Sequence, residues 1–308
     1  MKAISPIFFL EVEVLKLNQF LQQLINGLSL GSIYALIALG YTMVYGIIKL
    51  INFAHGDIYM LGAYIGFLVI SYFHVGFFPA LLIAMTLSSL IGVLIERIAY
   101  KPLRNATRIA ALITAIVVSF FLEYSTMNLM GAGVRTYPEV LPNSVYHIGG
   151  IQLSLHQIAI FITSIVLMIL LQFVVKKTKV GKAMRAVSTD ADAARLMGID
   201  VDRTISYTFA IGSALAGAAG ILVGVYYNTI NPLMGTVPGL KAFIAAVFGG
   251  IGVIPGAMFG GFFIGIVETL VSGYGSSLYK DAVVYGILIL ILIIKPSGLL
   301  GKDQKEKV

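Results

Sequence analysis

The chain has 308 residues, of which 58% are hydrophobic and only 11% are charged, and its mean hydropathy is +0.95. Globular domains usually carry about 25% charged residues, so the composition excludes a soluble domain and predicts a polytopic membrane protein. The absence of cysteine excludes disulfides and thiolate chemistry. The net charge of +7 is concentrated in a few loops, so we expect no nucleic-acid partner.

Residues 1–19 are predicted to form an interfacial or disordered lead-in, because Glu11, Glu13 and Lys16 interrupt the apolar run and no cleavage site follows. A spanning helix needs about 20 mainly apolar residues. The candidates in chain order are Phe20–Gly46, Ile58–Phe73, Phe77–Ile95, Ile109–Met130, Gln157–Val175, Ile205–Tyr227, Leu240–Val253, Gly256–Ser272 and Ala282–Ile294.

These segments predict an all-α bundle of eight to ten transmembrane segments, formed as one domain over residues 20–301 and followed by a tail at 302–308. The short segments Leu240–Val253 and Ala282–Ile294 are typical of tilted, broken or re-entrant helices that line a cavity. We therefore expect an interior path through the bundle.

Three segments hold most of the positive charge, namely Glu96–Arg108, Lys176–Ile205 and the tail from Lys295. Because basic loops stay in the cytoplasm, we expect all three segments, including the C-terminus, on the cytoplasmic side. Nine crossings then place the N-terminus outside and the loop Gly131–His156 outside as well.

Glycines four residues apart recur along the chain and indicate close helix packing in lipid. The densest cluster is "GGIGVIPGAMFGG" at residues 249–261. Its Gly252, Pro255 and Gly256 are predicted to end one helix and to start the next.

Asn52, His55 and Asp57 lie between the first two apolar segments, in the stretch "LINFAHGDIYMLGAY". A plain cytoplasmic turn and a helix break inside the bundle both account for them. The close apolar flanks favour the break, where such residues hold a bend or face the transport path. Glu123 and Glu268 lie within apolar segments, where each forms a helix–helix hydrogen bond or lines a pathway.

The sequence contains no phosphate-binding G-x-x-x-x-G-K-[ST] motif, and its histidines and carboxylates show no metal-ligand spacing. We therefore predict no catalytic residues, no metal site and no cofactor bound by this chain.

The loop at 176–205 is predicted to contain one short helix, capped by Ser188 or Thr189, with Asp190 and Asp192 in its first turn and Gly198 after its last. Ala194, Leu196 and Met197 would form a small apolar patch. Such a helix can lie on the lipid surface or dock in a groove of a soluble partner.

Several motifs of this chain resemble one family. The pattern Asp192-Ala193-Ala194-x-x-x-Gly198 is similar to the EAA-x-x-x-G motif of ABC importer permeases, with aspartate in place of glutamate. The stretches "GYTMVYGIIKLINFAHGDIYMLGAY", "RIAYKPLR", "GKAMRAVSTDADAARLMGID" and "AFIAAVFGGIGVIPGAMFGG" resemble permeases for branched-chain amino acids of the LivH type.

This resemblance implies a non-enzymatic permease subunit in a bacterial inner membrane. Its partners would be a second related permease, two cytoplasmic ATPase subunits that bind ATP and Mg²⁺, and a periplasmic binding protein that delivers leucine, isoleucine or valine. The coupling residues implied for the ATPase are Asp190, Asp192, Ala193, Ala194, Arg195 and Gly198. Relatives also carry urea, short amides and other amino acids. A secondary carrier and a passive channel are the alternatives from the residues alone.

Overall fold

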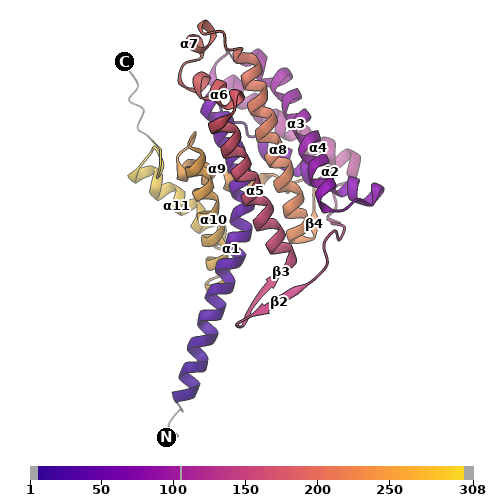
Figure 1. The fold of residues 1–308 in the computed structure, drawn as a ribbon, viewed down its shortest axis with the longest axis vertical. Helices are drawn as coiled ribbons and strands as arrows, with labels where there is room; N and C mark the ends of the chain where they lie inside the picture. Colours follow the sequence, from indigo (N-terminus) through magenta and orange to yellow (C-terminus); the bar gives the residue numbers. More distant parts are fainter. Residues whose placement is uncertain (1–5, 105, 302–308) are drawn as a thin grey trace.

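The protein folds into one helical bundle, described by a computed structural model over residues 6–104 and 106–301 (Figure 1). The α-helices are α1 (Pro6–Ile48), α2 (His55–Phe73), α3 (Phe77–Ile95), α4 (Arg108–Met130), α5 (Leu155–Lys177), α6 (Lys179–Thr189), α7 (Ala191–Leu196), α8 (Val201–Tyr227), α9 (Thr236–Gly249), α10 (Ile254–Tyr274) and α11 (Lys280–Ile294). A π-helical segment, Glu96–Tyr100, and a 3₁₀ turn, Lys101–Leu103, extend α3.

Seven helices among the described residues are long and apolar enough to cross a membrane. The apolar helices α9 and α11 are shorter, with 14 and 15 residues. Together they match the nine predicted segments in order, which confirms the all-α fold class. The first helix begins at Pro6 rather than Phe20, so most of the predicted lead-in at 1–19 is helical. The predicted tail at 302–308 lies outside the described residues.

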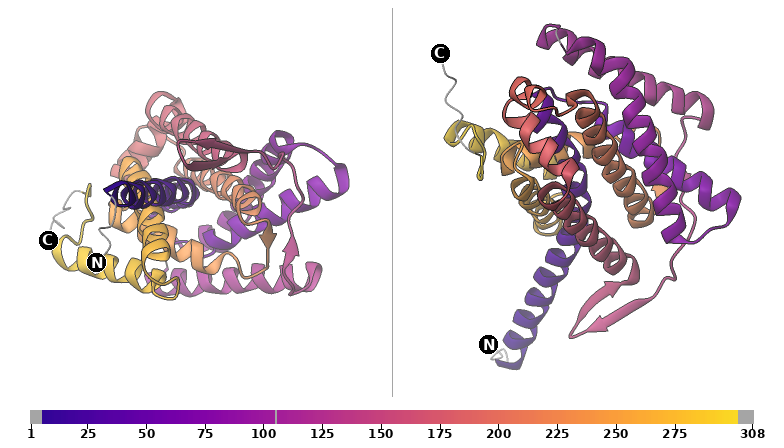
Figure 2. Two further views of the ribbon diagram at one scale, coloured as in Figure 1. Left: turned by 90° about the horizontal axis from the view of Figure 1, so that it is seen from below. Right: turned by 45° about the horizontal axis from the view of Figure 1, so that its top comes forward.

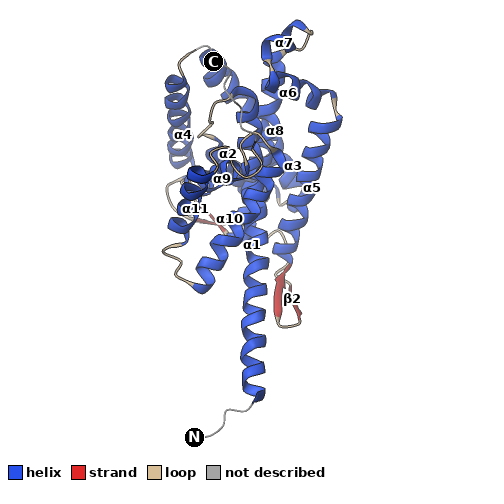
Figure 3. Ribbon diagram, turned by 90° about the vertical axis from the view of Figure 1, so that its left-hand side faces the viewer, coloured by secondary structure: helices blue, strands red, loops and turns tan. Residues whose placement is uncertain are grey.

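Helices α1 and α8 form the centre of the bundle, and most of their apolar residues are buried. Helices α5, α8, α9 and α10 pack against α1, which is seen nearly end-on in the left view of Figure 2. Only 33%, 22% and 28% of the residues in the apolar windows of α3, α4 and α5 are buried, as expected where helices meet lipid or another subunit. The N-terminal turns of α1 project beyond the bundle (Figure 3).

Small residues allow the central helices to touch through their backbones. A Cβ atom added at Gly265 on α10 would lie 2.3 Å from the Cα atom of Gly31 on α1. A Cβ atom at Gly62 on α2 would lie 2.4 Å from the Cα atom of Gly217 on α8. The predicted role of paired glycines in close helix packing is confirmed at these contacts.

The three basic segments meet at one end of the bundle, which we call the basic end. Arg104 pairs with Asp202 at the start of α8, with Nη1 and Oδ1 2.5 Å apart. Near the C-terminus, the Leu299 N–H donates to the Phe248 carbonyl at 2.8 Å, at the end of α9. Helices α6 and α7 occupy the same end (Figure 1).

Two small antiparallel sheets lie at the opposite end, which we call the hairpin end. Strand β1 (Arg135–Thr136) pairs with β4 (Thr229–Ile230), and β2 (Val145–Ile148) pairs with β3 (Ile151–Ser154). Next to β1, the ring of Tyr137 inserts beside Gly66 on α2 and Gly224 on α8. Burial raises the pKa of Tyr137 above its ordinary value, so its hydroxyl stays neutral.

Candidate functional site

The short helix α7 stands at the tip of the basic end (Figure 1). The Asp190 carboxylate caps it by accepting bonds from the N–H groups of Asp192 and Ala193, at 3.0 and 2.9 Å. At its other end Gly198 has a φ of +81°, and the Ile199 N–H reaches back to the Ala194 carbonyl. The bond from Ile199 to Ala194 is typical of a Schellman motif, which needs a left-handed residue such as glycine at the position of Gly198.

The structure corrects three details of the predicted loop at 176–205. Ser188 and Thr189 do not cap α7, because both belong to α6 and donate to the Arg185 carbonyl. The loop holds two helices instead of one. Ala194 is buried and leaves the predicted apolar patch, whereas Leu196 and Met197 are 89% and 82% exposed.

The exposed face of α7 combines these two apolar side chains with an ion pair. Arg195 Nη1 lies 3.4 Å from Asp192 Oδ1 on the solvent side, while Ala194 anchors the helix to the bundle. Asp190, Asp192, Ala193, Ala194, Arg195 and Gly198 therefore build one knob that is fixed at its base. A groove in a soluble partner could receive it.

Asn52, His55 and Asp57 lie at an interruption of the helical chain between α1 and α2, and they are 2%, 1% and 2% exposed. His55 packs edge-on against Tyr41 of α1, with ring centroids 4.8 Å apart. The Tyr100 hydroxyl donates to Asn52 Oδ1 at 2.8 Å. An exposed turn would not bury all three side chains, so the chain folds back into the bundle here.

The start of α2 lies well inside the bundle. His55 lies against Gly40, eight residues before the end of α1 at Ile48, which is about 12 Å along a helix. The start of α9 meets it there, since a Cβ atom at Gly56 would lie 2.6 Å from the Gly235 carbonyl oxygen. Two helices thus begin side by side in the interior.

Gly252, Pro255 and Gly256 form the turn between α9 and α10. Pro255 lies in the first turn of α10, where its missing N–H group is tolerated. Gly252 has a φ of +90°, and a Cβ atom at Gly256 would lie 2.2 Å from the Gly249 carbonyl oxygen. The turn adjoins Gly46 near the end of α1, at the basic end.

A cavity of about 220 Å³ lies where α2 and α9 begin, and we call it the inner cavity. Its lining residues are Tyr41, Phe53, Gly56, Asp57, Ile116, Ser119, Gly235, Thr236, Gly239, Leu240 and Phe243. Asp57 accepts a hydrogen bond from Ser119 on α4. Nearby, Thr236 Oγ1 donates to Glu123 Oε1 at 2.9 Å. Asn52 and His55 are absent from this lining, although they neighbour Asp57 in sequence.

A charge cluster, of which sequence reasoning identified only Glu268, joins α9, α10 and α11. Lys241 Nζ lies 2.8 Å from Glu268 Oε1 and 2.6 Å from Asp281 Oδ1. Tyr34 on α1 donates to Glu268 Oε2 at 2.8 Å, and Lys280 Nζ lies 3.2 Å from Glu268 Oε1. An isolated lysine within an apolar segment was the available signal.

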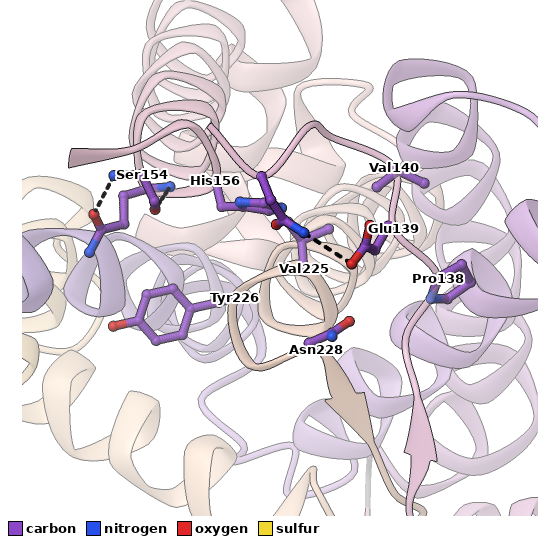
Figure 4. Close-up of a pocket in the computed structure, with 10 residues that line it drawn as sticks. Pro138, Glu139, Val140, Ser154, His156, Val225, Tyr226 and Asn228 are labelled. Carbon is purple, nitrogen blue, oxygen red and sulfur yellow. Dashed lines mark hydrogen bonds between the residues drawn. The ribbon is translucent and has the colours of Figure 1, made fainter. Parts of the chain in front are cut away.

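A second cavity, of about 430 Å³, opens at the hairpin end (Figure 4). The residues around this outer cavity come from the loop before β2, the start of α5 and the end of α8. They include Glu139, Asn143, His156, Tyr226 and Asn228. Asn143 Nδ2 donates to Glu139 Oε1 at 3.0 Å. Polar and apolar groups contribute about equally to this lining, whereas the wall of the inner cavity is largely apolar.

Comparison with known proteins gives one family over nearly the whole chain. Residues 23–292 match the family described as branched-chain amino acid transport system / permease component. The chain is 44% identical to the high-affinity branched-chain amino acid transport system permease protein LivH of Salmonella typhimurium, over 94% of this chain and 98% of that protein.

Two further relatives come from other organisms. BraD, the corresponding permease protein of Pseudomonas aeruginosa, is 43% identical over 95% of this chain and 99% of its own length. A probable LivH permease of Methanocaldococcus jannaschii is 31% identical over 90% of this chain and 91% of its length. No solved structure matches the chain significantly.

Proposed function

Because this chain belongs to the family of permease components of branched-chain amino acid transport systems, we propose that it is the membrane-spanning permease subunit of an ABC importer for leucine, isoleucine and valine. The observation that carries this proposal is similarity over 94% of the chain to a permease of that name. The subunit itself is not an enzyme. We expect ATP and Mg²⁺ to be bound by partner ATPase subunits and no cofactor by this chain.

The proposed complex contains a second related permease, two cytoplasmic ATPase subunits and a periplasmic binding protein. The knob of α7, with Leu196 and Met197 exposed, has the size and chemistry to seat in an ATPase groove. The exposed apolar faces of α3, α4 and α5 supply the surface for lipid and for the second permease.

The proposed orientation places the basic end in the cytoplasm and the hairpin end in the periplasm of a bacterial inner membrane. Its support is the joint location of the three basic segments at one end. The C-terminus is then cytoplasmic, and the binding protein docks at the end that holds the outer cavity. Asn52, His55, Asp57, Gly252, Pro255 and Gly256 are proposed to hold the helix breaks or to face the transport path.

The substrate class is tested by uptake of labelled leucine into proteoliposomes that hold the complete complex. We expect unlabelled isoleucine and valine, added in excess, to abolish the signal, whereas urea and acetamide leave it unchanged. Competition by urea or acetamide that matches the competition by valine would refute the proposed substrate class.

A further inference from the structure

The inner cavity is lined by a carboxyl group, that of Asp57, which pairs with no lysine or arginine among the described residues. Asp57 is almost fully buried, and its hydrogen-bond donor is the neutral hydroxyl of Ser119. None of the ion pairs formed by the described residues includes Asp57. A buried carboxylate without a counter-ion is unfavourable, and a cationic group bound in the cavity would supply that counter-ion.

The second acid beside the cavity has the same property. Glu123 accepts from Thr236, which lines the cavity, and it too is absent from the ion pairs of the described chain. The contrast with Glu268 is informative, since that acid contacts Lys241 and Lys280. Asp57, Glu123 and Glu268 all lie within apolar helices. Among the described residues, Glu268 has basic partners, whereas Asp57 and Glu123 have none.

The rest of the wall is apolar and aromatic. The Phe243 ring lies 5.8 Å from the Tyr41 ring and 6.0 Å from the Phe53 ring, measured between centroids. Ile116 and Leu240 complete the apolar surface. The volume of about 220 Å³ equals roughly seven water molecules at about 30 Å³ each, which suits a single small molecule.

We propose that the inner cavity binds the amino acid in transit, with the Asp57 carboxylate holding its ammonium group and Tyr41, Phe53 and Phe243 packing on its aliphatic side chain. This inference rests on the proposed function and names the residues of this chain that contact the substrate. The cavity lies where α2 and α9 begin, so bound substrate contacts the two interior helix starts at once.

The test uses the purified complete complex in detergent, with a single cysteine introduced into the cysteine-free chain. Ser119→Cys is labelled with 2-aminoethyl methanethiosulfonate, with and without saturating leucine. We expect leucine to slow labelling about ten-fold or more, as a bound ligand that occludes the cavity does. Asn143→Cys in the outer cavity is the matched control and should label at the same rate in both conditions.

Two further variants separate binding by Asp57 from a general structural effect. Ile116→Cys leaves the bond between Ser119 and Asp57 in place and should show the same protection by leucine. Adding Asp57→Asn to Ile116→Cys should abolish that protection, because a charge-assisted bond is lost, while a neutral maleimide still labels the cysteine. Protection by leucine that persists in the Asp57→Asn variant, with the maleimide still labelling the cysteine, would overturn the assignment to Asp57.

Uptake of leucine by the complex with the unsubstituted chain keeps the two claims separate. ATP-driven uptake by that complex, without protection at Ser119→Cys and Ile116→Cys, would overturn the inner cavity as the binding site and leave the proposed function standing. Protection of both cysteines, with no ATP-driven uptake by the unsubstituted complex, would support the cavity and overturn the proposed function.

Discussion

Lys241 is a buried basic residue that pairs with two acids, Glu268 and Asp281. Lys241 and Glu268 are each 3% exposed and are bonded to each other. Removing Lys241 leaves buried Glu268 with Lys280 alone, at 3.2 Å, and takes from Asp281 its partner at 2.6 Å; breaking a buried pair costs up to about 3–5 kcal/mol. Replacing both Lys241 and Glu268 leaves only the partly exposed Lys280 and Asp281 and costs less.

We therefore expect Lys241→Met to lower the unfolding temperature of the purified protein strongly, and Lys241→Met combined with Glu268→Met to restore much of the loss. The measurement is thermal unfolding in detergent, with Lys182→Met at the surface of α6 as the control. A double variant less stable than the single variant would show that the pair stabilises the fold by more than mutual neutralisation.

For single residues, sequence reasoning identified the buried acids but not the basic residues that form ion pairs with them. Glu123 and Glu268 were identified because acids are rare in apolar segments. Lys241 is 27 residues from Glu268, and the pairing depends on how α9 packs on α10. The polar stretch containing Asn52, His55 and Asp57 was likewise located, while its burial required the fold.

Among single elements, α7 carries the most specific functional prediction. Its cap at Asp190 and its left-handed Gly198 hold a helix of only six residues that could not persist alone. Loss of an N-cap costs about 1 kcal/mol, and a β-branched residue at a left-handed position costs about 1–3 kcal/mol.

Asp190→Ala and Gly198→Val should therefore release the ATPase subunits from the permease while membrane insertion continues. The readout is co-purification of the ATPase subunits with the permease, together with binding-protein-stimulated ATP hydrolysis. Asp200→Ala is the matched control, because Asp200 caps α8 instead, through the Arg203 N–H at 3.0 Å. Normal assembly and hydrolysis in both α7 variants would contradict the docking assignment.

The element boundaries show what periodicity and caps can and cannot fix. Gly198 and the turn at Pro255 were predictable, because each residue type has a restricted backbone role. The cap at Asp190 was misassigned to Ser188 or Thr189, since all three types cap helices. The position at which α9 begins, beside the start of α2, was not predictable from hydropathy. Gly56 and Gly235 come into contact only in the folded bundle.

In the whole molecule, α6, α7 and the segment at 297–301 lie at the basic end, and the β2–β3 hairpin lies at the opposite, hairpin end (Figure 1). The proposed orientation then predicts which side each cysteine probe faces. In intact spheroplasts, His147→Cys on β2 should react with an impermeant maleimide, and Ser188→Cys on α6 should react only after lysis. The reverse pattern would invert the orientation.

ATP-driven uptake by the complete complex tests the central claim most directly. Proteoliposomes holding this permease, its partner permease, the ATPase subunits and the binding protein are given labelled leucine in the presence of proton and sodium ionophores. We predict accumulation that requires ATP and survives the ionophores. Accumulation by this chain alone along an ion gradient, without ATP, would contradict the account and establish a secondary carrier.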